Sequence, residues 1–412
     1  GYGMANLEYG IPLDADSVFR IGSTSKQFTA TAIALLAEQG KISLDDALSV
    51  FFPEFPAWAK NITVRQLVHH SSGIRDYLQL AWLAGRGDDA DYYTDQWVID
   101  LLARQRDTNF TPGSQYLYSN SGYLLLAHIV QRVSGQSLRE YAQQNIFQPL
   151  GMTATHFHND HAEIVPRRAS GYAPAESGYR ISMTTLDMVG DGGVFTTINE
   201  LLAWDRNFYH NRLGRGGPNL VSTLTTPGRF NDGSAMDYAF GLSVEDFRGL
   251  KMISHGGAFV GFRAEMIRFP QQRFSVAALC NRADARPTQL AKQVAAHYLS
   301  EQLTAPPQEA LAPTPAHSLS GEQLAGYAGD YWEASEAFAA EVAFVEGKLW
   351  AVHSPTRRNE LAPVASDQFR MIGVPGDVQI HFDREDDAII RMRRTIDGSS
   401  RGVFTPLSLI HI

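Results

Sequence analysis

Two residues three positions apart, Ser23 and Lys26, have the types that nucleophilic catalysis requires. A serine hydroxyl is a weak nucleophile until a neighbouring base removes its proton. Residues three apart share one face of a helix, and the helix dipole and burial would both lower the pKa of the lysine. Of the six lysines, Lys26 is the one with a serine three residues before it. The pair is therefore a candidate nucleophile and base; the alternative is a capping serine and a surface lysine.

A second candidate element is Tyr118-Ser119-Asn120, which follows a turn and precedes an apolar helical pattern. A phenol near a cation can titrate low enough to move protons, and an asparagine amide can bind a substrate ester or amide. The alternative is a core tyrosine and a capping asparagine. The same spacing recurs at Tyr209–Asn211 without a preceding turn, so we expect no site there.

The third element is His255-Gly256-Gly257-Ala258. Glycines in a strand let a ligand lie close to the backbone. The backbone N–H groups of Ala258 and Ser23 would together form an oxyanion hole. His255 would hold a substrate carboxylate or tune the tyrosine and lysine; the alternative is an ordinary glycine turn with a surface histidine.

Helix and strand patterns indicate which elements position these residues. We expect helices over 25–39 and 121–134, because apolar residues recur at helical spacing and a glycine follows each segment. A capping box at Thr197 and Glu200 opens a third helix toward Tyr209. Residues 252–269 are typical of two strands with a glycine-rich turn, and Phe274–Cys280 is typical of a central strand. The expected architecture is an antiparallel sheet flanked by helices.

The 412 residues divide at a Pro- and Ala-rich segment, 304–318, which is typical of a linker. Residues 1–303 form the mixed helix and strand part. Residues 319–408 contain short alternating runs separated by glycine turns, which predict a small antiparallel barrel.

Composition excludes several classes of protein. The net charge is −9 and no basic run occurs, so nucleic acid is not an expected partner. No apolar run approaches the roughly 18 residues of a membrane span. The single cysteine, Cys280, excludes an internal disulfide framework and a cysteine zinc site.

Three further patterns contain residue types that occur in functional sites. The side chains of His156, His158, Asp160 and His161 are metal-ligand types, but without helical spacing they are more typical of a polar loop, and we predict no metal. Gly398–Gly402 matches a nucleophile elbow, but no helix follows it. Residues 77–93 are either a lid over an acyl pocket or a surface excursion.

The three elements, in this order, resemble the serine β-lactamase and penicillin-binding protein superfamily, most closely its class C β-lactamase-like branch of esterases, D-aminopeptidases and DD-carboxypeptidases. Supporting stretches are 19–26, 62–74, 110–113 and 149–152. The resemblance implies an α+β fold with an all-helical subdomain. It also implies an acylated Ser23, general base and acid work shared by Lys26 and Tyr118, and no metal or organic cofactor. The implied substrate-binding residues are Asn120, His255, Gly257 and Ala258.

Two departures from the family pattern modify this expectation. His255 stands where true class C β-lactamases have the lysine of Lys-Thr-Gly, and a histidine is a weaker anchor for a carboxylate. This change favours an esterase or D-amino-acid peptidase over a DD-carboxypeptidase or β-lactamase. Family members usually have a helix and a strand before the segment that begins this chain, so we expect N-terminal elements to be missing.

The C-terminal part resembles the lipocalin-like barrels that follow some superfamily members. Such a module could restrict the cleft, mediate assembly or bind a ligand, and a non-catalytic binding or assembly protein is the remaining alternative. The expected partner is a small-molecule or peptide substrate, and the resemblance implies a periplasmic or secreted location. The sequence gives no prediction of oligomeric state.

Overall fold

The computed structural model describes residues 1–86, 91–175, 177–304, 318–333, 338–354, 357–372, 374, 378–396 and 399–409. The chain divides into two units, Gly1–Ala305 and Pro306–Ile412. Except for its two end residues, the expected linker 304–318 lies outside the described residues.

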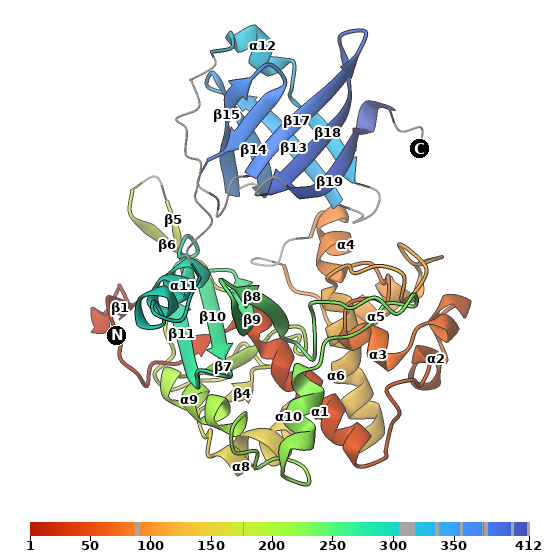
Figure 1. The fold of residues 1–412 in the computed structure, drawn as a ribbon, viewed down its shortest axis with the longest axis vertical. Helices are drawn as coiled ribbons and strands as arrows, with labels where there is room; N and C mark the ends of the chain where they lie inside the picture. Colours follow the sequence, from red (N-terminus) through yellow and green to blue (C-terminus); the bar gives the residue numbers. More distant parts are fainter. Residues whose placement is uncertain are drawn as a thin grey trace. The chain divides into compact units, whose positions relative to one another are not determined.

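The first unit contains a four-stranded antiparallel sheet in the order β11-β10-β9-β8 (Figure 1). Its strands are β8 (Ser243–Phe247), β9 (Leu250–Phe259), β10 (Phe262–Phe269) and β11 (Phe274–Cys280). Helix α11 (Pro287–Tyr298) packs on β10 and β11, and α9 (Ile198–Asn207) also contacts β11. The α+β architecture expected from the sequence is confirmed.

Two details of this sheet differ from the expectation. Gly256 and Gly257 lie within β9 rather than in the turn, which falls between Phe259 and Phe262. Phe274–Cys280 is an edge strand, not a central one. Both α9 and α11 contact this strand, yet all seven of its residues are only partly buried.

A second, three-stranded sheet joins distant parts of the first unit. Its order is β3 (Phe19–Arg20), β7 (Val194–Thr196) and β4 (His156–Phe157). The remaining strands of the unit pair as hairpins: β1 (Met4–Asn6) with β2 (Ile11–Pro12), and β5 (Tyr172–Pro174) with β6 (Tyr179–Ile181). Strand β3 leads directly toward Ser23, so this sheet fixes the approach to the first candidate element.

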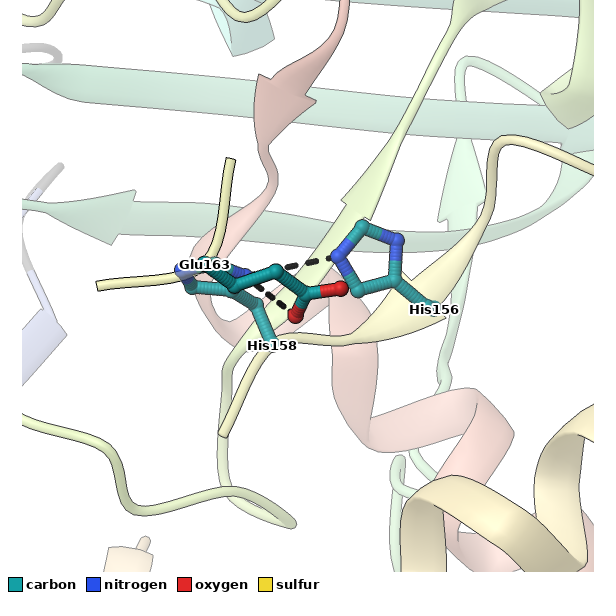
Figure 2. A group of neighbouring side chains, drawn as sticks. All are labelled: His156, His158 and Glu163. Carbon is teal, nitrogen blue, oxygen red and sulfur yellow. Dashed lines mark hydrogen bonds and ion pairs between the residues drawn. The ribbon is translucent and has the colours of Figure 1, made fainter. Parts of the chain in front are cut away.

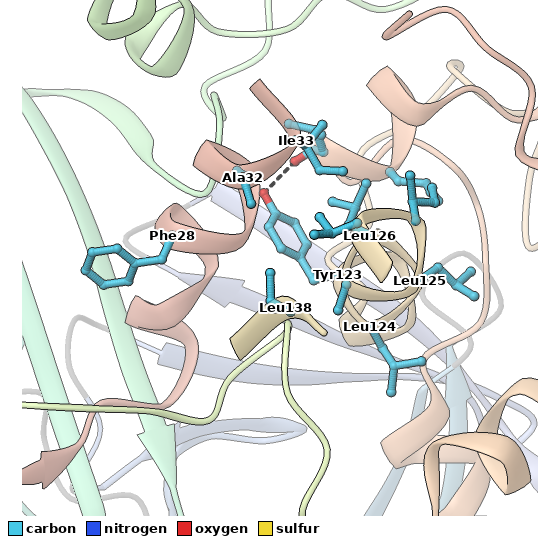
Figure 3. Close-up of a cluster of buried hydrophobic side chains, with 14 of the residues drawn as sticks. Phe28, Ala32, Ile33, Tyr123, Leu124, Leu125, Leu126 and Leu138 are labelled. Atoms are coloured by element: carbon cyan, nitrogen blue, oxygen red, sulfur yellow. Dashed lines mark hydrogen bonds between the residues drawn. The ribbon is translucent and has the colours of Figure 1, made fainter. Parts of the chain in front are cut away.

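The helical part of the first unit is organised around α1 (Lys26–Glu38) and α6 (Asn120–Ser134). Every residue of α1 from Lys26 to Leu36 is buried, so the helix is central rather than amphipathic. Phe28, Ala32 and Ile33 of α1 belong to the same core as residues 123–126 of α6 (Figure 3). Gly135 ends α6 in the left-handed conformation, with φ 75°.

Shorter helices complete this part of the unit. They are α2 (Leu48–Phe51), η2 (Ala57–Asn61), α3 (Val64–Val68), α4 (Tyr77–Leu83), α5 (Asp95–Ala103), α7 (Leu138–Ala142), η3 (Gln143–Phe147), α8 (Gln148–Leu150) and α10 (Pro218–Thr225). The Thr197 hydroxyl caps α9 as expected, but the Glu200 carboxylate accepts instead from the Ala154 N–H at 2.8 Å. Glu200 therefore ties α9 to the segment before β4.

The second unit is a closed antiparallel barrel, β12 to β19, as the alternating runs predict. Its strands are β12 (Gly329–Glu333), β13 (Phe338–Val345), β14 (Lys348–Ser354), β15 (Arg357–Ala365), β16 (Gln368–Met371), β17 (Val378–Glu385), β18 (Ala388–Ile396) and β19 (Ser399–Pro406), with helices α12 (Gly321–Ala325) and η4 (Leu407–Leu409) at the ends. Ser400, the serine at the centre of the Gly398–Gly402 pattern, lies within β19, so it does not stand on a strand-to-helix elbow; Gly398 lies outside the described residues. In the described part of the chain, no helix combines the length and apolarity needed to cross a membrane.

Candidate active site

Ser23 stands at the entrance of the helix that carries Lys26. Residues Gly22–Ser25 form the 3-10 turn η1, and α1 begins directly after it. Ser23 is half-buried, whereas the Lys26 side chain is completely buried. The Lys26 amine lies 3.2 Å from the Ser23 hydroxyl oxygen. The fold thus brings the two residues into contact, and Lys26 is not a surface lysine.

The Lys26 amine has two closer partners, and both are carbonyl oxygens. Asn120 Oδ1 lies 2.8 Å from Nζ and the backbone oxygen of Asp191 lies 2.6 Å from it. Burial lowers the pKa of Lys26 to about 8, and the negative charges of Asp191 and Asp76 oppose part of that change. A neutral amine has two N–H donors and one lone pair. With the donors directed at the two carbonyls, the lone pair faces Ser23.

Asn120 is held in the orientation that this contact needs. Its side-chain NH₂ group donates to Asp76 Oδ2 at 2.9 Å, and its backbone N–H donates to the same oxygen at 2.6 Å. Because the amide nitrogen is committed to a carboxylate, Oδ1 must face Lys26. Asp76 itself caps α4 by accepting from Leu78. This aspartate therefore positions Lys26 through Asn120.

The loop that carries Asp191 is pinned to α1 and the turn before it. The Thr29 hydroxyl donates to the Gly190 oxygen at 2.7 Å, and the Val194 N–H donates to the Ser25 hydroxyl at 3.0 Å. Gly190 has φ 119°, and a Cβ there would lie 2.7 Å from the Tyr123 oxygen. Only glycine fits this passage between α1 and α6.

Tyr118 reaches the same hydroxyl from the other side. Its phenol is hydrogen-bonded to Ser23, and the Lys26 amine lies 4.7 Å from the centre of its ring. The surrounding protein desolvates the phenol and raises the pKa of Tyr118 well above its ordinary value, which the bond to Ser23 opposes only in part. Tyr118 is therefore neutral at physiological pH. The expectation of a phenol that titrates low is wrong, because burial outweighs the nearby amine.

Strand β9 approaches η1 along an edge that β8 does not cover. Strand β8 pairs with β9 only as far as Ser254. Beyond that point the Thr24 hydroxyl donates to the His255 oxygen at 3.2 Å, which joins η1 to β9. A Cβ at Gly257 would lie 1.9 Å from the Ile21 oxygen, so glycine is what permits the approach. Ser23 and Ala258 consequently line one pocket, as an oxyanion hole between their N–H groups requires.

His255 lies behind this edge rather than in the pocket. The side chain is buried; Nδ1 lies 2.6 Å from the Gly256 oxygen and Nε2 lies 2.9 Å from the Tyr238 hydroxyl. Burial lowers the pKa of His255 to about 4, so the ring is neutral. A neutral ring with both nitrogens engaged is not arranged to hold a substrate carboxylate. Its ring centre lies 6.3 Å from that of Tyr118, and the second expected role, tuning the tyrosine and lysine, stays a prediction.

The pocket beside Ser23 is small. Its volume is about 100 Å³, and Leu186, Met188 and Phe259 supply apolar walls. The buried carboxylate of Asp191 also faces it and accepts from the Tyr77 hydroxyl at 2.9 Å. Burial raises the pKa of Asp191, and the positive charge of Lys26 opposes that rise. Arg20 lines the same pocket with its guanidinium 4.8 Å from the ring centre of Phe259.

Sequence reasoning missed Asp76, Tyr77 and Asp191. Asp76 carried a detectable signal, because an aspartate before an apolar helical run is a helix cap. For Asp191 no local signal exists; its place follows from the convergence of distant segments. The start of 77–93 lines the pocket, since Tyr77 and Leu78 face it, whereas Trp82 and Tyr92 are exposed. That segment is thus partly a pocket wall and partly a surface excursion, and its residues 87–90 lie outside the described ones.

Three of the four candidate metal ligands fall into two groups, whereas the Asp160 carboxylate accepts from the Ala162 N–H at 2.9 Å. His156 and His158 lie together and are joined by Glu163, which was not among the candidates. His161 instead faces Asp187, with Nδ1 3.0 Å from Oδ2. Burial lowers the pKa of His158 to about 4. The segment is not merely a polar loop, because β4 begins at His156 and the chain brings His156 and His158 beside Glu163.

Comparison with known proteins gives a family and several relatives. A family model described as Beta-lactamase matches residues 1–299. "Penicillin-binding protein 4*" of Bacillus subtilis (strain 168) is 28% identical over 97% of this chain and 90% of its own length. A "D-aminopeptidase" of Brucella anthropi is 31% identical over 68% of this chain and 52% of its own length. The chain thus spans about half the length of that D-aminopeptidase.

A solved structure shares the fold over nearly the whole chain. It is the "octameric penicillin-binding protein homologue from Pyrococcus abyssi", with a TM-score of 0.66 and 24% identity. The similarity covers 98% of this chain and 92% of that one. It includes the barrel unit, which fits a lipocalin-like domain.

The close approach of β9 to η1 generates a prediction for Gly257→Ala. The added methyl group would collide with the Ile21 oxygen, so we expect a loss of about 1–3 kcal/mol in the free energy of unfolding. The collision would also move the backbone N–H of Ala258 away from that of Ser23. Because these two groups would form the oxyanion hole, labelling of Ser23 by a fluorophosphonate probe should become slower. Thermal denaturation and the labelling rate measure the two effects.

The neighbouring variant Gly256→Ala is the matched control. Its Cβ would lie 3.1 Å from the Glu265 carboxylate, the end of a side chain that can shift. Equal loss of labelling in both variants would mean that β9 tolerates no substitution at all, and would count against a specific role for the Gly257 contact.

Proposed function

Because the chain belongs to the Beta-lactamase family, we propose that it is a serine hydrolase of amides or esters in which Ser23 becomes acylated. In this mechanism the neutral Lys26 amine takes the proton of the Ser23 hydroxyl, and the oxygen attacks the substrate carbonyl carbon. The N–H groups of Ser23 and Ala258 bind the oxyanion of the tetrahedral intermediate. The leaving group departs with a proton relayed from Lys26 through Tyr118, and water then hydrolyses the acyl-enzyme.

One observation carries this assignment: the set of partners around the Lys26 amine. Two carbonyl oxygens at 2.6 and 2.8 Å occupy its donors, and the Ser23 oxygen is the third neighbour at 3.2 Å. A structural lysine would pair with a carboxylate, whereas this amine is buried against neutral acceptors and its pKa is lowered to about 8. Such an environment is what a general base near neutral pH requires. It supports an enzyme over a non-catalytic binding or assembly protein on the same scaffold.

The division of labour between the two proton carriers follows from their pKa values. Lys26 can lose its proton near neutral pH, whereas the pKa of Tyr118 is raised well above its ordinary value. We therefore assign the base to Lys26 and give Tyr118 the role of a neutral donor that passes a proton. Asn120 holds Lys26 in place, and its position in the pocket also lets it contact substrate.

The pocket favours an α-amino acid amide or peptide as substrate. Asp191 is a buried carboxylate in the pocket of Ser23, where it also interacts with the Arg20 guanidinium; a substrate ammonium is the further group that would pair with it. A volume of about 100 Å³ suits a short acyl part. The name of the D-aminopeptidase relative supports a substrate whose amino acid has the D-configuration. We therefore favour a D-amino-acid peptidase over a general esterase.

A DD-carboxypeptidase or β-lactamase is the second candidate. Both would act on substrates with a carboxylate, and the penicillin-binding names of two relatives favour them. The neutral, doubly engaged ring of His255 argues against a carboxylate anchor there. The periplasmic or secreted location implied by the resemblance stays a prediction.

The central test is the identity of the acylated residue. We expect mass spectrometry to find an acyl adduct on Ser23 after incubation with p-nitrophenyl acetate, a D-amino-acid p-nitroanilide or a fluorescent penicillin. Ser23→Ala should lower turnover by about 10⁴-fold or more, because the nucleophile is gone. Ser43→Ala, at an exposed serine, is the control. An adduct on another residue, or full turnover by Ser23→Ala, would contradict the mechanism; a lasting penicillin adduct would favour the second candidate.

The pH dependence follows from the lowered pKa of Lys26. The active form is the neutral amine, so kcat/KM should fall about tenfold per unit as the pH drops below about 8 and level off above it. Tyr118→Phe should lower the plateau by about 10²- to 10⁴-fold while the inflection stays near the same pH. A profile that is flat from pH 6 to about 9, or that falls as pH rises through 8, would remove Lys26 from the role of base.

The role of Asp191 is tested by two substrates that differ only at the amine. For D-alanine p-nitroanilide, Asp191→Asn should lower kcat/KM by about 10- to 100-fold, because a charged hydrogen bond is lost. For N-acetyl-D-alanine p-nitroanilide it should change little. The ratio between the substrates cancels any change in the pKa of Lys26, since both use the same base.

Asp187→Asn is the control variant for this comparison of two substrates. It removes a carboxylate that faces His161. An unchanged ratio in Asp191→Asn would eliminate the ammonium contact and leave the hydrolase assignment intact.

A further inference from the structure

His156, His158 and Glu163 direct one ligand-type atom each toward a common point (Figure 2). Strand β4 covers His156 and Phe157, and the His158 N–H continues the pairing by donating to the Gly193 oxygen at 2.8 Å, so extended backbone puts His156 and His158 on the same face. Glu163 returns to them from the loop that follows. The three atoms lie within 4.8 Å of one another.

The distances between these atoms are long for hydrogen bonds. His156 Nε2 is 3.4 Å from His158 Nδ1, and His158 Nδ1 is 3.6 Å from Glu163 Oε2. Good hydrogen bonds from nitrogen span roughly 2.7–3.2 Å. A tetrahedral cation with bonds of about 2.0–2.1 Å to nitrogen and oxygen sets its ligand atoms roughly 3.3–3.4 Å apart. The observed spacing is thus closer to that of ligands sharing a cation.

Groups behind these residues hold two of them in a ligating orientation. His156 Nδ1 lies 3.2 Å from the Ala154 oxygen, so a proton on Nδ1 leaves the lone pair of Nε2 facing the other two residues. The Glu163 carboxylate accepts two hydrogen bonds from Arg139, at 2.6 and 2.7 Å. Each carboxylate oxygen has two lone pairs, so Oε2 can accept from Arg139 and still bind a cation. Supporting contacts of both kinds are usual around metal ligands.

Solvent reaches this cluster through a cavity that is separate from the pocket of Ser23. The cavity has a volume of about 840 Å³, and both His156 and Glu163 line it. The His158 side chain is 3% exposed and does not line the cavity. Acidic side chains outnumber basic ones along the wall, which favours a cation; they are Asp16, Glu140, Glu163 and Glu200 against Arg139 and Arg167. The opening leaves room for water as a fourth ligand.

We propose that His156, His158 and Glu163 bind a divalent transition-metal ion of the zinc type in this chain. Two imidazole nitrogens and one carboxylate oxygen are a donor set that suits Zn²⁺. The ion links β4 to the loop that carries Glu163 and, through Arg139, to α7. The site replaces the sequence-based expectation of no metal, which rested on a polar loop and did not include Glu163.

Metal uptake by the full chain tests the proposal. The protein is prepared without a histidine tag, stripped with a chelator and titrated with Zn²⁺ by calorimetry, with bound metal counted by mass spectrometry. We expect one Zn²⁺ per chain, a higher thermal midpoint with zinc, and visible absorption typical of tetrahedral coordination when Co²⁺ replaces it. His156→Asn and Glu163→Gln should each weaken binding by at least about tenfold.

Controls separate lost ligands from lost folding. His161→Asn removes a nearby histidine that faces Asp187 and should bind zinc as the wild type does. Both ligand variants change partly exposed side chains, and their thermal midpoints without metal should stay close to that of the wild type. Binding of fewer than one zinc per chain by the wild type, or wild-type affinity in both ligand variants, would overturn the site and leave a packed polar cluster.

Discussion

The burial of one lysine amine beside one serine hydroxyl is the constraint on which the first unit depends. An ammonium group loses its hydration when it is buried, so a buried lysine favours the neutral form. Its N–H groups still need acceptors, and Asn120 and the Asp191 backbone supply them from segments far away in the chain. Each acceptor is itself held, the first by Asp76 and the second by a glycine-containing loop bonded to α1.

Glycines make this convergence sterically possible. Gly190 lets the Asp191 loop pass between α1 and α6, and Gly257 lets β9 touch the turn that carries Ser23. In both places a Cβ would meet a backbone oxygen, which cannot move aside as the end of a long side chain would, and at Gly190 it would also meet the Ala127 Cβ. The close contact of β9 with η1 also sets where Ala258 stands relative to Ser23.

The parts of the fold and of the candidate active site that the sequence predicts are those with a local signal in the chain. The spacing of Ser23 and Lys26, the glycine that ends α6 and the alternating runs of the barrel each depend on neighbours in the chain, and each expectation agrees with the structure. Asp191 has no such signal, because its oxygen reaches Lys26 from 165 residues away. His156 and His158 come together at the end of a strand of two residues, and so short a strand has no readable period in the sequence. The low pKa expected for Tyr118 failed because desolvation cannot be read from neighbours in sequence.

The barrel unit has an interior that its own side chains already occupy. Among the described residues, large rings and aliphatic groups fill it, including Tyr331, Phe369, Phe382, Met392 and Phe404. Eight strands enclose a space just wide enough for such side chains or for one small ligand. The described side chains therefore occupy much of the interior, and Ile372 and Val403 are exposed on the outside of the unit.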